Sequence, residues 1–370
     1  MQRNRTRKII TALLHAASFA LLAGPAHSAF ATDADYIGRH RLVYIGGVGK
    51  YHQHLNLYCV GSGSPTVVFE SGIADWGFTW ALVHPHIATM TQACVYDRAG
   101  LGNSDAARRA STSDHMVDDL HRLLQAAHLA PPYVLVGHSL GGLNVRLYAD
   151  RFLSEVAGIV LVDPTHEDGI RRIDAQKNNQ ESQRYAAEVA RARGCLFQSV
   201  GAHDRRNFRR DCIEPDDPHY SAALNAERVR IEQRPSFQRA QLSELTHYAD
   251  GTSFADVRNA RRWYGMLPLV VLSASETIDR VGPEWRSLHQ ELAMLSRLGV
   301  QCTVAASGHY IQLDQPQTVV AAVAAVVHRV RQAHPPAKNG SSAFDYTSSA
   351  HSDPAPSMSC PDQSKSVAPS

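Results

Sequence analysis

A single serine, Ser139, lies within a glycine-rich run in residues 133–152, YVLVGHSLGGLNVRLYADRF. An apolar stretch that predicts a buried strand precedes it, and an amphipathic stretch that predicts a helix follows. Gly137, Ser139 and Gly141 fit the G-x-S-x-G pattern, in which a sharp strand-to-helix turn makes the serine hydroxyl project. The flanking residues must be small because backbone segments come close there. The pattern therefore favours a nucleophile at Ser139 over a simple helix cap.

A nucleophilic serine needs a base that accepts its proton. His309, in the stretch SGHYIQLDQPQTVV, follows the last predicted strand and precedes the last predicted helix. The order serine before histidine agrees with the order expected of the architecture that the strand–turn–helix pattern around Ser139 indicates. We therefore expect His309 to be the general base.

Backbone N–H groups near the serine are candidates for an oxyanion hole. The predicted strand VVFESG leads into IADWGFTW, where Gly72 permits a close backbone approach and Ile73 follows it. We expect the N–H groups of Ile73 and Leu140 to stabilise negative charge on the substrate carbonyl oxygen. The alternative is that Ser71 and Gly72 form an ordinary turn.

No metal or cofactor is expected. The chain has twenty histidines, so a lone histidine indicates little. His52 and His54, like His84 and His86, are spaced by two, which does not place both on one helix face, and no carboxylate cluster accompanies them. The absence of a C-x-x-C motif argues against a zinc ribbon or a thioredoxin-like site.

Strand-like runs alternate with helix-like runs, which predicts an α/β fold with a mostly parallel sheet flanked by helices. Several of the runs are apolar throughout, as is typical of strands that are covered on both faces. The eight predicted strands are RLVYIGG, HLNLYCVGSG, TVVFESG, ACVYDR, YVLVGHS, GIVLVDP, LPLVVLSAS and QCTVAASGH, and the first two resemble a hairpin. The clearest helical segments are residues 112–127, 141–152 and 317–333.

The chain divides into a core, an insertion and two terminal segments. Residues 39–163 and 265–334 form the predicted core. Residues 164–264 are polar and helical by pattern, and we interpret them as a lid inserted above the end of the sheet rather than as an inert spacer. Residues 335–370 are rich in serine, proline and alanine without periodicity, which predicts a disordered tail.

Residues 1–31 have the pattern of a secretory signal peptide: a basic head, an apolar run and small residues at a cleavage site. The alternative, an uncleaved anchor helix, is disfavoured because the apolar run is short and His15 interrupts it. The protein is thus expected to be secreted or periplasmic, with no stable membrane anchor after cleavage. The formal net charge is only +2, so nucleic acid is not an expected partner.

The six cysteines fit an oxidising compartment. Cys195 and Cys212 flank a short arginine-rich loop and could close it, and Cys59 and Cys94 each lie in a predicted strand. Cys302 and Cys360 have no obvious partner. Buried free thiols are the alternative for any pair.

These motifs together resemble the α/β-hydrolase fold superfamily of esterase- and lipase-like enzymes. The resemblance runs from about Arg39 to Gln332, apart from the lid, which varies within the superfamily. It rests on the ordered motifs ESG…W, YDRAGLGNSD, VGHSLGG and SGHYIQLDQP. Within YDRAGLGNSD the matching residues, which the resemblance marks as mainly structural, are Asp97, Arg98, Gly100, Gly102 and Ser104.

The resemblance implies that a carboxylate at one of two positions completes the triad. One position follows the strand LPLVVLSAS, where the chain offers Glu276 and then Asp279, without the usual Gly-x-x-Asp spacing. The other position closes the strand GIVLVDP and offers Asp163. We favour Asp163, because a residue at a strand end is held more rigidly than one in a loop.

The leading interpretation is an exported serine hydrolase that cleaves a small-molecule carboxylic ester. One alternative is peptide or amide cleavage by the same residues, as in the prolyl aminopeptidase-like branch, with perhydrolase or haloperoxidase-like activity as a side possibility. Another alternative is a non-catalytic binding protein, which is disfavoured because nucleophile, base and acid candidates are all present.

Overall fold

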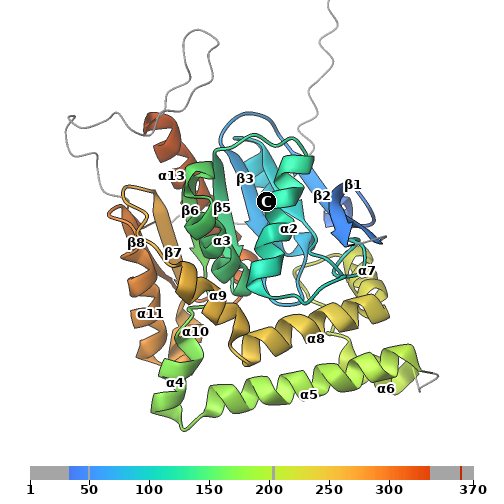
Figure 1. Cartoon of the computed structure of the whole chain (residues 1–370). Coiled ribbons are helices and arrows are strands. Elements are labelled where there is room, and N and C mark those ends of the chain that lie inside the picture. Colours follow the sequence, from blue (N-terminus) through green and yellow to red (C-terminus); the bar gives the residue numbers. More distant parts are fainter. Residues whose placement is uncertain (1–32, 49–50, 202–204, 334–358, 361–370) are drawn as a thin grey trace, which may run out of the picture. The chain divides into compact units, whose positions relative to one another are not determined.

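The computed structural model describes residues 33–48, 51–201, 205–333 and 359–360. Its eight-stranded sheet has the order β1-β2-β4-β3-β5-β6-β7-β8. Strand β2 is antiparallel to β1 and β4, and the other neighbouring pairs are parallel. The strands are β1 (Arg41–Val48), β2 (Tyr51–Val60), β3 (Thr66–Glu70), β4 (Ala93–Tyr96), β5 (Tyr133–His138), β6 (Val156–Val162), β7 (Leu269–Ala274) and β8 (Gly299–Val304). The predicted fold class and all eight predicted strand segments are confirmed (Figure 1).

Helices cover both faces of the sheet, which explains why the central strands are apolar throughout. Every residue of β3, β5, β6 and β7 is buried. Val134 and Val136 pack in one apolar layer, whereas Leu135 packs in the other. The first layer includes residues of α1 (His84–Ala88) and α13 (Pro316–Ala333). The second includes residues of α2 (Ser113–Ala126), α3 (Leu140–Arg151), α9 (Thr252–Ala260) and α11 (Pro283–Ala293).

The chain between β6 and β7 is helical, as its pattern predicted. Its helices are α4 (Gly169–Lys177), α5 (Gln180–Val200), α6 (Arg205–Cys212), α7 (Ala222–Glu232), α8 (Pro235–Ala249) and α9. Helices α5 and α8 pack side by side, whereas α9 packs against α2 and α3 (Figure 1). The lid function of this insertion, and its bounds at residues 164 and 264, stay predictions.

The remaining elements of the described chain are short. They are η1 (Asp33–Tyr36), η2 (Gly77–Trp80), η3 (Leu153–Glu155), α10 (Ser275–Val281) and α12 (Ile311–Asp314). The parallel strands β3, β5, β6, β7 and β8 all end at the same edge of the sheet, so the segments that follow them meet there. This edge is where a parallel sheet gathers functional groups.

All six cysteines form disulfide bonds. Cys59 and Cys94 face each other across β2 and β4, and Cys195 and Cys212 join α5 to the end of α6. The third bond joins Cys302 on β8 to Cys360. The sequence offered no partner for these last two cysteines because 58 positions separate them and no predicted element includes Cys360.

Two sequence predictions fall outside the described residues. The signal peptide at residues 1–31 lies there entirely, and the predicted disordered tail at residues 335–370 lies there except for Ser359 and Cys360. Within the part of the chain that the structure describes, no helix has the length and apolarity to cross a membrane.

Candidate active site

Ser139 occupies a strained turn between β5 and α3. Its backbone has φ 52° and ψ −119°, which a residue with a side chain rarely adopts and which costs about 1–3 kcal/mol. Hydrogen bonds on both sides hold this conformation: the Ser139 N–H donates to the carbonyl oxygen of Val162 at 3.2 Å, and its own carbonyl oxygen accepts from the N–H groups of Gly142 and Thr165, each at 3.0 Å. The turn lifts the serine side chain out of the sheet edge.

The glycines around Ser139 are required by close backbone approaches. A Cβ atom on Gly137 would collide with the carbonyl oxygen of Gly141, and one on Gly141 would collide with the carbonyl oxygen of Glu70. A Cβ atom on Gly142 would lie 2.6 Å from the Cβ atom of Pro164. Their small size therefore has the physical cause that the sequence pattern suggested.

His309 forms a hydrogen bond with Asp163, with 2.7 Å between Nδ1 and Oδ2. Asp163 is fully buried, and its other oxygen accepts from the backbone N–H of Ala274 at 3.1 Å and from the indole Nε1–H of Trp285 at 3.0 Å. Because a carboxylate only accepts, the Nδ1 atom of His309 carries the proton, and Nε2 is left with a free lone pair. No local sequence motif indicated the roles of Ala274 and Trp285.

Asp163 is ionised in this setting. Burial alone would raise its pKa. The hydrogen bond from His309, the charge interaction with that ring, and smaller contributions from His289 and Trp285 together outweigh the effect of burial. The net effect lowers the pKa of Asp163 to about 2. Such a carboxylate can both orient His309 and stabilise its protonated form.

The alternative acids lie elsewhere. Glu276 and Asp279 are exposed on α10, the helix that follows β7. The Glu276 carboxylate lies near Gly308 but makes no hydrogen bond with His309 in the described structure, and its backbone N–H donates to the carbonyl oxygen of Ser307. Of the three carboxylates, Asp163 is the one that contacts His309.

Ile73 and Leu140 lie on the two segments that border the serine. Leu140 begins α3, so its N–H is among those that lack an acceptor within the helix. The next N–H after Ile73, that of Ala74, donates to the Oε2 atom of Glu244 at 2.7 Å. Among the described residues no acceptor contacts the N–H of Ile73, which is available to a ligand.

Arg98 holds the turn that carries Ile73. Its guanidinium donates to the carbonyl oxygens of Ser71 at 2.7 Å and Gly72 at 2.5 Å. The same group pairs with Glu244 at 2.7 Å and with Glu70 at 3.2 Å. The structural role that the resemblance implied for Arg98 is thus visible, whereas nothing in the sequence indicated that Glu244 reaches this turn.

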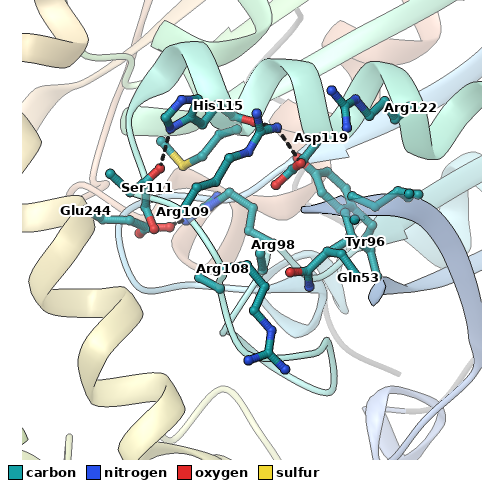
Figure 2. Close-up of a pocket in the computed structure, with 18 residues that line it drawn as sticks. Gln53, Tyr96, Arg98, Arg108, Arg109, Ser111, His115, Asp119, Arg122 and Glu244 are labelled. Atoms are coloured by element: carbon teal, nitrogen blue, oxygen red, sulfur yellow. Dashed lines mark hydrogen bonds and ion pairs between the residues drawn. The ribbon is translucent and has the colours of Figure 1, made fainter. Parts of the chain in front are cut away.

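Arg98 and Glu244 also line a cavity of about 150 Å³ on the side of α2, shown in Figure 2. Three of the four arginines in its lining have acidic partners: Arg98 pairs with Glu70 and Glu244, Arg109 with Asp118 and Asp119, and Arg122 with Asp118. Neither Ser139 nor His309 lines this cavity. It is therefore a poor candidate for the reaction site.

His138 contacts the loop that carries His309. Its Nε2–H donates to the carbonyl oxygen of His309 at 3.0 Å, and the two ring centroids lie 4.6 Å apart. Burial, and to a smaller extent the repulsion that a protonated His309 ring would exert, lowers the pKa of His138 to about 3. His138 is therefore neutral near neutral pH and acts as a support rather than a second base.

Ser139 and His309 line a common cavity of about 110 Å³. The helical insertion supplies much of its wall, including Ile173 from α4, Tyr185 from α5 and Tyr248 from α8. The rings of Tyr185 and Tyr248 lie 4.6 Å apart, and their hydroxyl groups are hydrogen-bonded at 3.3 Å. The insertion therefore borders the serine directly.

Comparisons with known proteins agree with this architecture. The model of the Alpha/beta hydrolase family matches residues 67–323, so the chain belongs to that family. The Uncharacterized protein YqjL of Bacillus subtilis (strain 168) is 26% identical over 285 residues, which cover 75% of this chain and 88% of that protein.

Two solved structures show the shared fold at low sequence identity. Epoxide hydrolase CorEH without ligand has a TM-score of 0.56 and 19% identity, and the match covers 80% of this chain and 100% of that one. The meta-cleavage product hydrolase from Pseudomonas fluorescens IP01 has a TM-score of 0.53 and 18% identity over 80% of this chain and 98% of that one. Family membership supports a hydrolase that acts on small molecules.

Proposed function

We propose that the protein is a serine hydrolase that cleaves carboxylic esters, with Ser139 as nucleophile, His309 as base and Asp163 as the acid behind it. The observation that supports this most is the 2.7 Å hydrogen bond between Asp163 and His309, whose ring lines the same cavity as Ser139. A serine on a strained turn beside a histidine of fixed tautomer suits acyl transfer.

In the acylation step, the Oγ atom of Ser139 attacks the ester carbonyl carbon while the Nε2 atom of His309 accepts the hydroxyl proton. The carbonyl oxygen becomes negatively charged and accepts hydrogen bonds from the N–H groups of Ile73 and Leu140. His309 then donates its proton to the leaving alkoxide, and the C–O ester bond breaks. The acyl group stays on Ser139.

In the second step, water attacks the acyl-enzyme while His309 again accepts a proton, and the acid product leaves as Ser139 regains its hydrogen. Asp163 stabilises the protonated ring in both steps. Neither step requires a metal or a cofactor.

The test is covalent labelling with a fluorophosphonate probe, together with p-nitrophenyl esters and aminoacyl amides as substrates. The wild type should be labelled on Ser139 and should hydrolyse the esters, whereas Ser139→Ala should do neither. Cleavage of the amides but not of the esters would favour the peptidase or amidase alternative. A wild-type protein that binds no probe and cleaves neither substrate would be a non-catalytic protein.

We also propose that the protein is exported, with residues 1–31 removed as a signal peptide. The three disulfide bonds support an oxidising compartment, because such bonds persist there and are rare in reducing ones. Intact-mass measurement of the protein from the extracellular or periplasmic fraction tests this. Recovery of the full-length chain from the cytosol alone would contradict it.

A further inference from the structure

A second and larger cavity, of about 470 Å³, is lined in part by the turn that carries Ile73. Its walls come from this turn, from the segment between α6 and α7, from α7 and α8, and from the loop after His309. Ile73 and Tyr310 belong to its lining, so the cavity adjoins the proposed oxyanion donor and the residue next to the proposed base. Its wall chemistry differs from that of the cavity beside Ser139.

The lining of this cavity is strongly acidic. Five carboxylates face one arginine, Arg228, and the histidine in the lining, His219, is hydrogen-bonded to one of the five. The carboxylates are Asp75, Glu214, Asp216, Asp217 and Glu232. Two arginines offset only part of this charge: Arg228 lies 3.8 Å from Glu232, and Arg191, outside the lining, lies 3.6 Å from Glu214. The Nη1 atom of Arg228 also donates to the side-chain oxygen of Asn225 at 2.8 Å.

Unpartnered polar atoms show that this is more than a cluster of surface acids. The Oδ2 atom of Asp75 is buried and has no hydrogen-bond partner among the described residues. The hydroxyl of Tyr220, a residue only 8% exposed, is likewise buried and unpartnered. The Nε1 atom of Trp76 and the Nε atom of Arg228, two residues of the same lining, are also buried without a partner among the described residues. Buried polar groups are nearly always satisfied, so these atoms indicate a polar or charged ligand.

Aromatic rings complete the lining. Trp76, Phe78, Tyr220, Phe237 and Tyr310 all contribute to the wall. The ring centroids of Trp76 and Phe78 lie 4.4 Å apart, and those of Phe78 and Tyr220 lie 5.2 Å apart, so these three rings contact one another in sequence. Carboxylates combined with aromatic faces are the surroundings that bind organic cations, through charge and through cation–π attraction.

A metal ion does not account for these acids. In the part of the chain that the structure describes, no group of three or more histidine, cysteine, aspartate or glutamate side chains has the arrangement to hold one. The cavity volume also suits an organic group better than a single ion. We propose that this cavity binds an alkylammonium group of the ester substrate, and this inference rests on the proposed function.

The protonation behaviour of the two inner carboxylates agrees with a missing cation. Burial raises the pKa of Asp75 to about 6, against the opposing effects of the Tyr310 hydroxyl, Arg98 and Arg228. Burial, together with repulsion from Glu214 and Asp75, raises the pKa of Glu232 to about 7. A bound ammonium group would favour the ionised form of both carboxylates.

The experiment compares esters that differ only in charge, on the mature protein with its disulfides intact. One pair places a trimethylammonium group or a neutral tert-butyl group on the alkoxy arm, and a second pair places them on the acyl arm. In at least one pair, kcat/KM should be at least about tenfold higher for the cationic ester. Glu232→Gln should reduce this preference severalfold. Glu227→Gln, on the same helix but outside the cavity lining, should leave the preference unchanged.

The outcomes separate this inference from the proposed function. Cleavage of the neutral esters without a preference for either cationic ester would overturn the inference and leave the proposed function intact. If no ester is cleaved, the proposed function fails. Calorimetric titration of wild type with butyltrimethylammonium then tests whether the cavity binds an organic cation. Binding that Glu232→Gln weakens would support a cation site, and no binding would overturn it.

Discussion

Glu244 on α8 accepts a hydrogen bond from the backbone N–H of Ala74 at 2.7 Å, although 170 positions separate the two residues in sequence. Ala74 has a φ of 60° and directly follows Ile73, the proposed oxyanion donor. Glu244 also pairs with Arg98, which binds the carbonyl oxygens of the same turn. The helical insertion thus contributes to the shape of a turn in the core, in addition to lining the cavity that Ser139 also lines.

Replacing Glu244 by glutamine should weaken this arrangement. The amide oxygen can still accept from Ala74, but Arg98, which is 4% exposed, loses a charged partner and keeps only Glu70. The loss of a hydrogen bond between charged groups predicts a fall of about 2 kcal/mol in the free energy of unfolding. Urea unfolding monitored by fluorescence measures it.

The control is Asp279→Asn, which removes an exposed carboxylate on α10. Its unfolding free energy should change by less than about 0.5 kcal/mol. Equal urea midpoints for Glu244→Gln and wild type would show that the pair with Arg98 contributes no stability.

The proposed role of Asp163 predicts that replacing its carboxylate by an amide of the same shape lowers kcat strongly. Asp163→Asn keeps the side-chain shape but removes the negative charge that fixes the tautomer of His309, so kcat should fall by about 10³–10⁴. Glu276→Gln should retain nearly normal turnover, because Glu276 is exposed and does not contact the ring. Steady-state kinetics with a p-nitrophenyl ester measures both.

The opposite result, normal turnover in Asp163→Asn and loss in Glu276→Gln, would move the acid to α10. Thermal unfolding of both variants shows whether an activity loss reflects loss of the fold, since Asp163 also accepts bonds from Ala274 and Trp285.

The sequence predicted the strands well because most of them are short apolar runs, rich in valine and other β-branched residues and bounded by turn residues, as is typical of strands covered on both faces. Ser139 and His309 could also be predicted from the sequence, since local motifs surround each one. The contacts that hold them could not be predicted, because Trp285 and Glu244 reach the site from helices whose packing no local pattern specifies. The bond between Cys302 and Cys360 was missed because 58 positions separate the two residues and no predicted element includes Cys360.

Gly72 is predicted to be essential for the oxyanion turn. A Cβ atom there would lie 2.9 Å from the Nδ1 atom of His138 and 3.2 Å from the Oδ2 atom of Asp75, and both of these atoms are buried. Gly72→Ala should therefore displace the N–H of Ile73 and lower kcat by about 10²-fold or more. Ester kinetics with burst-phase analysis measures the acylation step.

Gly194 on α5 provides the matched glycine control, because among the described residues no atom beyond the neighbouring helix backbone lies within 4 Å of the Cβ that alanine would add. Gly194→Ala should keep normal kinetics and raise stability slightly, since alanine favours a helix. An unchanged acylation rate in Gly72→Ala would show that this turn does not form part of the oxyanion hole.

Tyr185 is predicted to limit the size of the group beside Ser139. Tyr185→Ala would enlarge a cavity that now measures about 110 Å³, so the preferred straight-chain ester should become longer. A series of p-nitrophenyl esters of increasing acyl length, compared by kcat/KM, measures the change. Phe197→Ala, on the same helix but 66% exposed, should keep the wild-type profile. An identical profile in Tyr185→Ala would argue against the insertion as a lid that selects substrates.

Glu232 predicts an unusual dependence of stability on pH. Its pKa rises from an ordinary value of 4.5 to about 7 in the folded protein, where Glu214, Asp75 and Arg228 face it. The folded state therefore binds the proton more tightly than the unfolded state, and stability falls as pH rises from about 4.5 to about 7. The contribution lost is about 2–3 kcal/mol.

Glu232→Gln lacks this titration, so its unfolding free energy relative to wild type should increase from about pH 5 to about pH 8. Glu227→Gln is the control: burial of Glu227 is outweighed by Arg230, which lowers its pKa, so its difference from wild type should stay constant over this range. Urea unfolding at several pH values measures both. If the difference in unfolding free energy between Glu232→Gln and wild type stayed constant, Glu232 would already be ionised at about pH 5. Arg228 would then be sufficient to neutralise Glu232 without a bound cation.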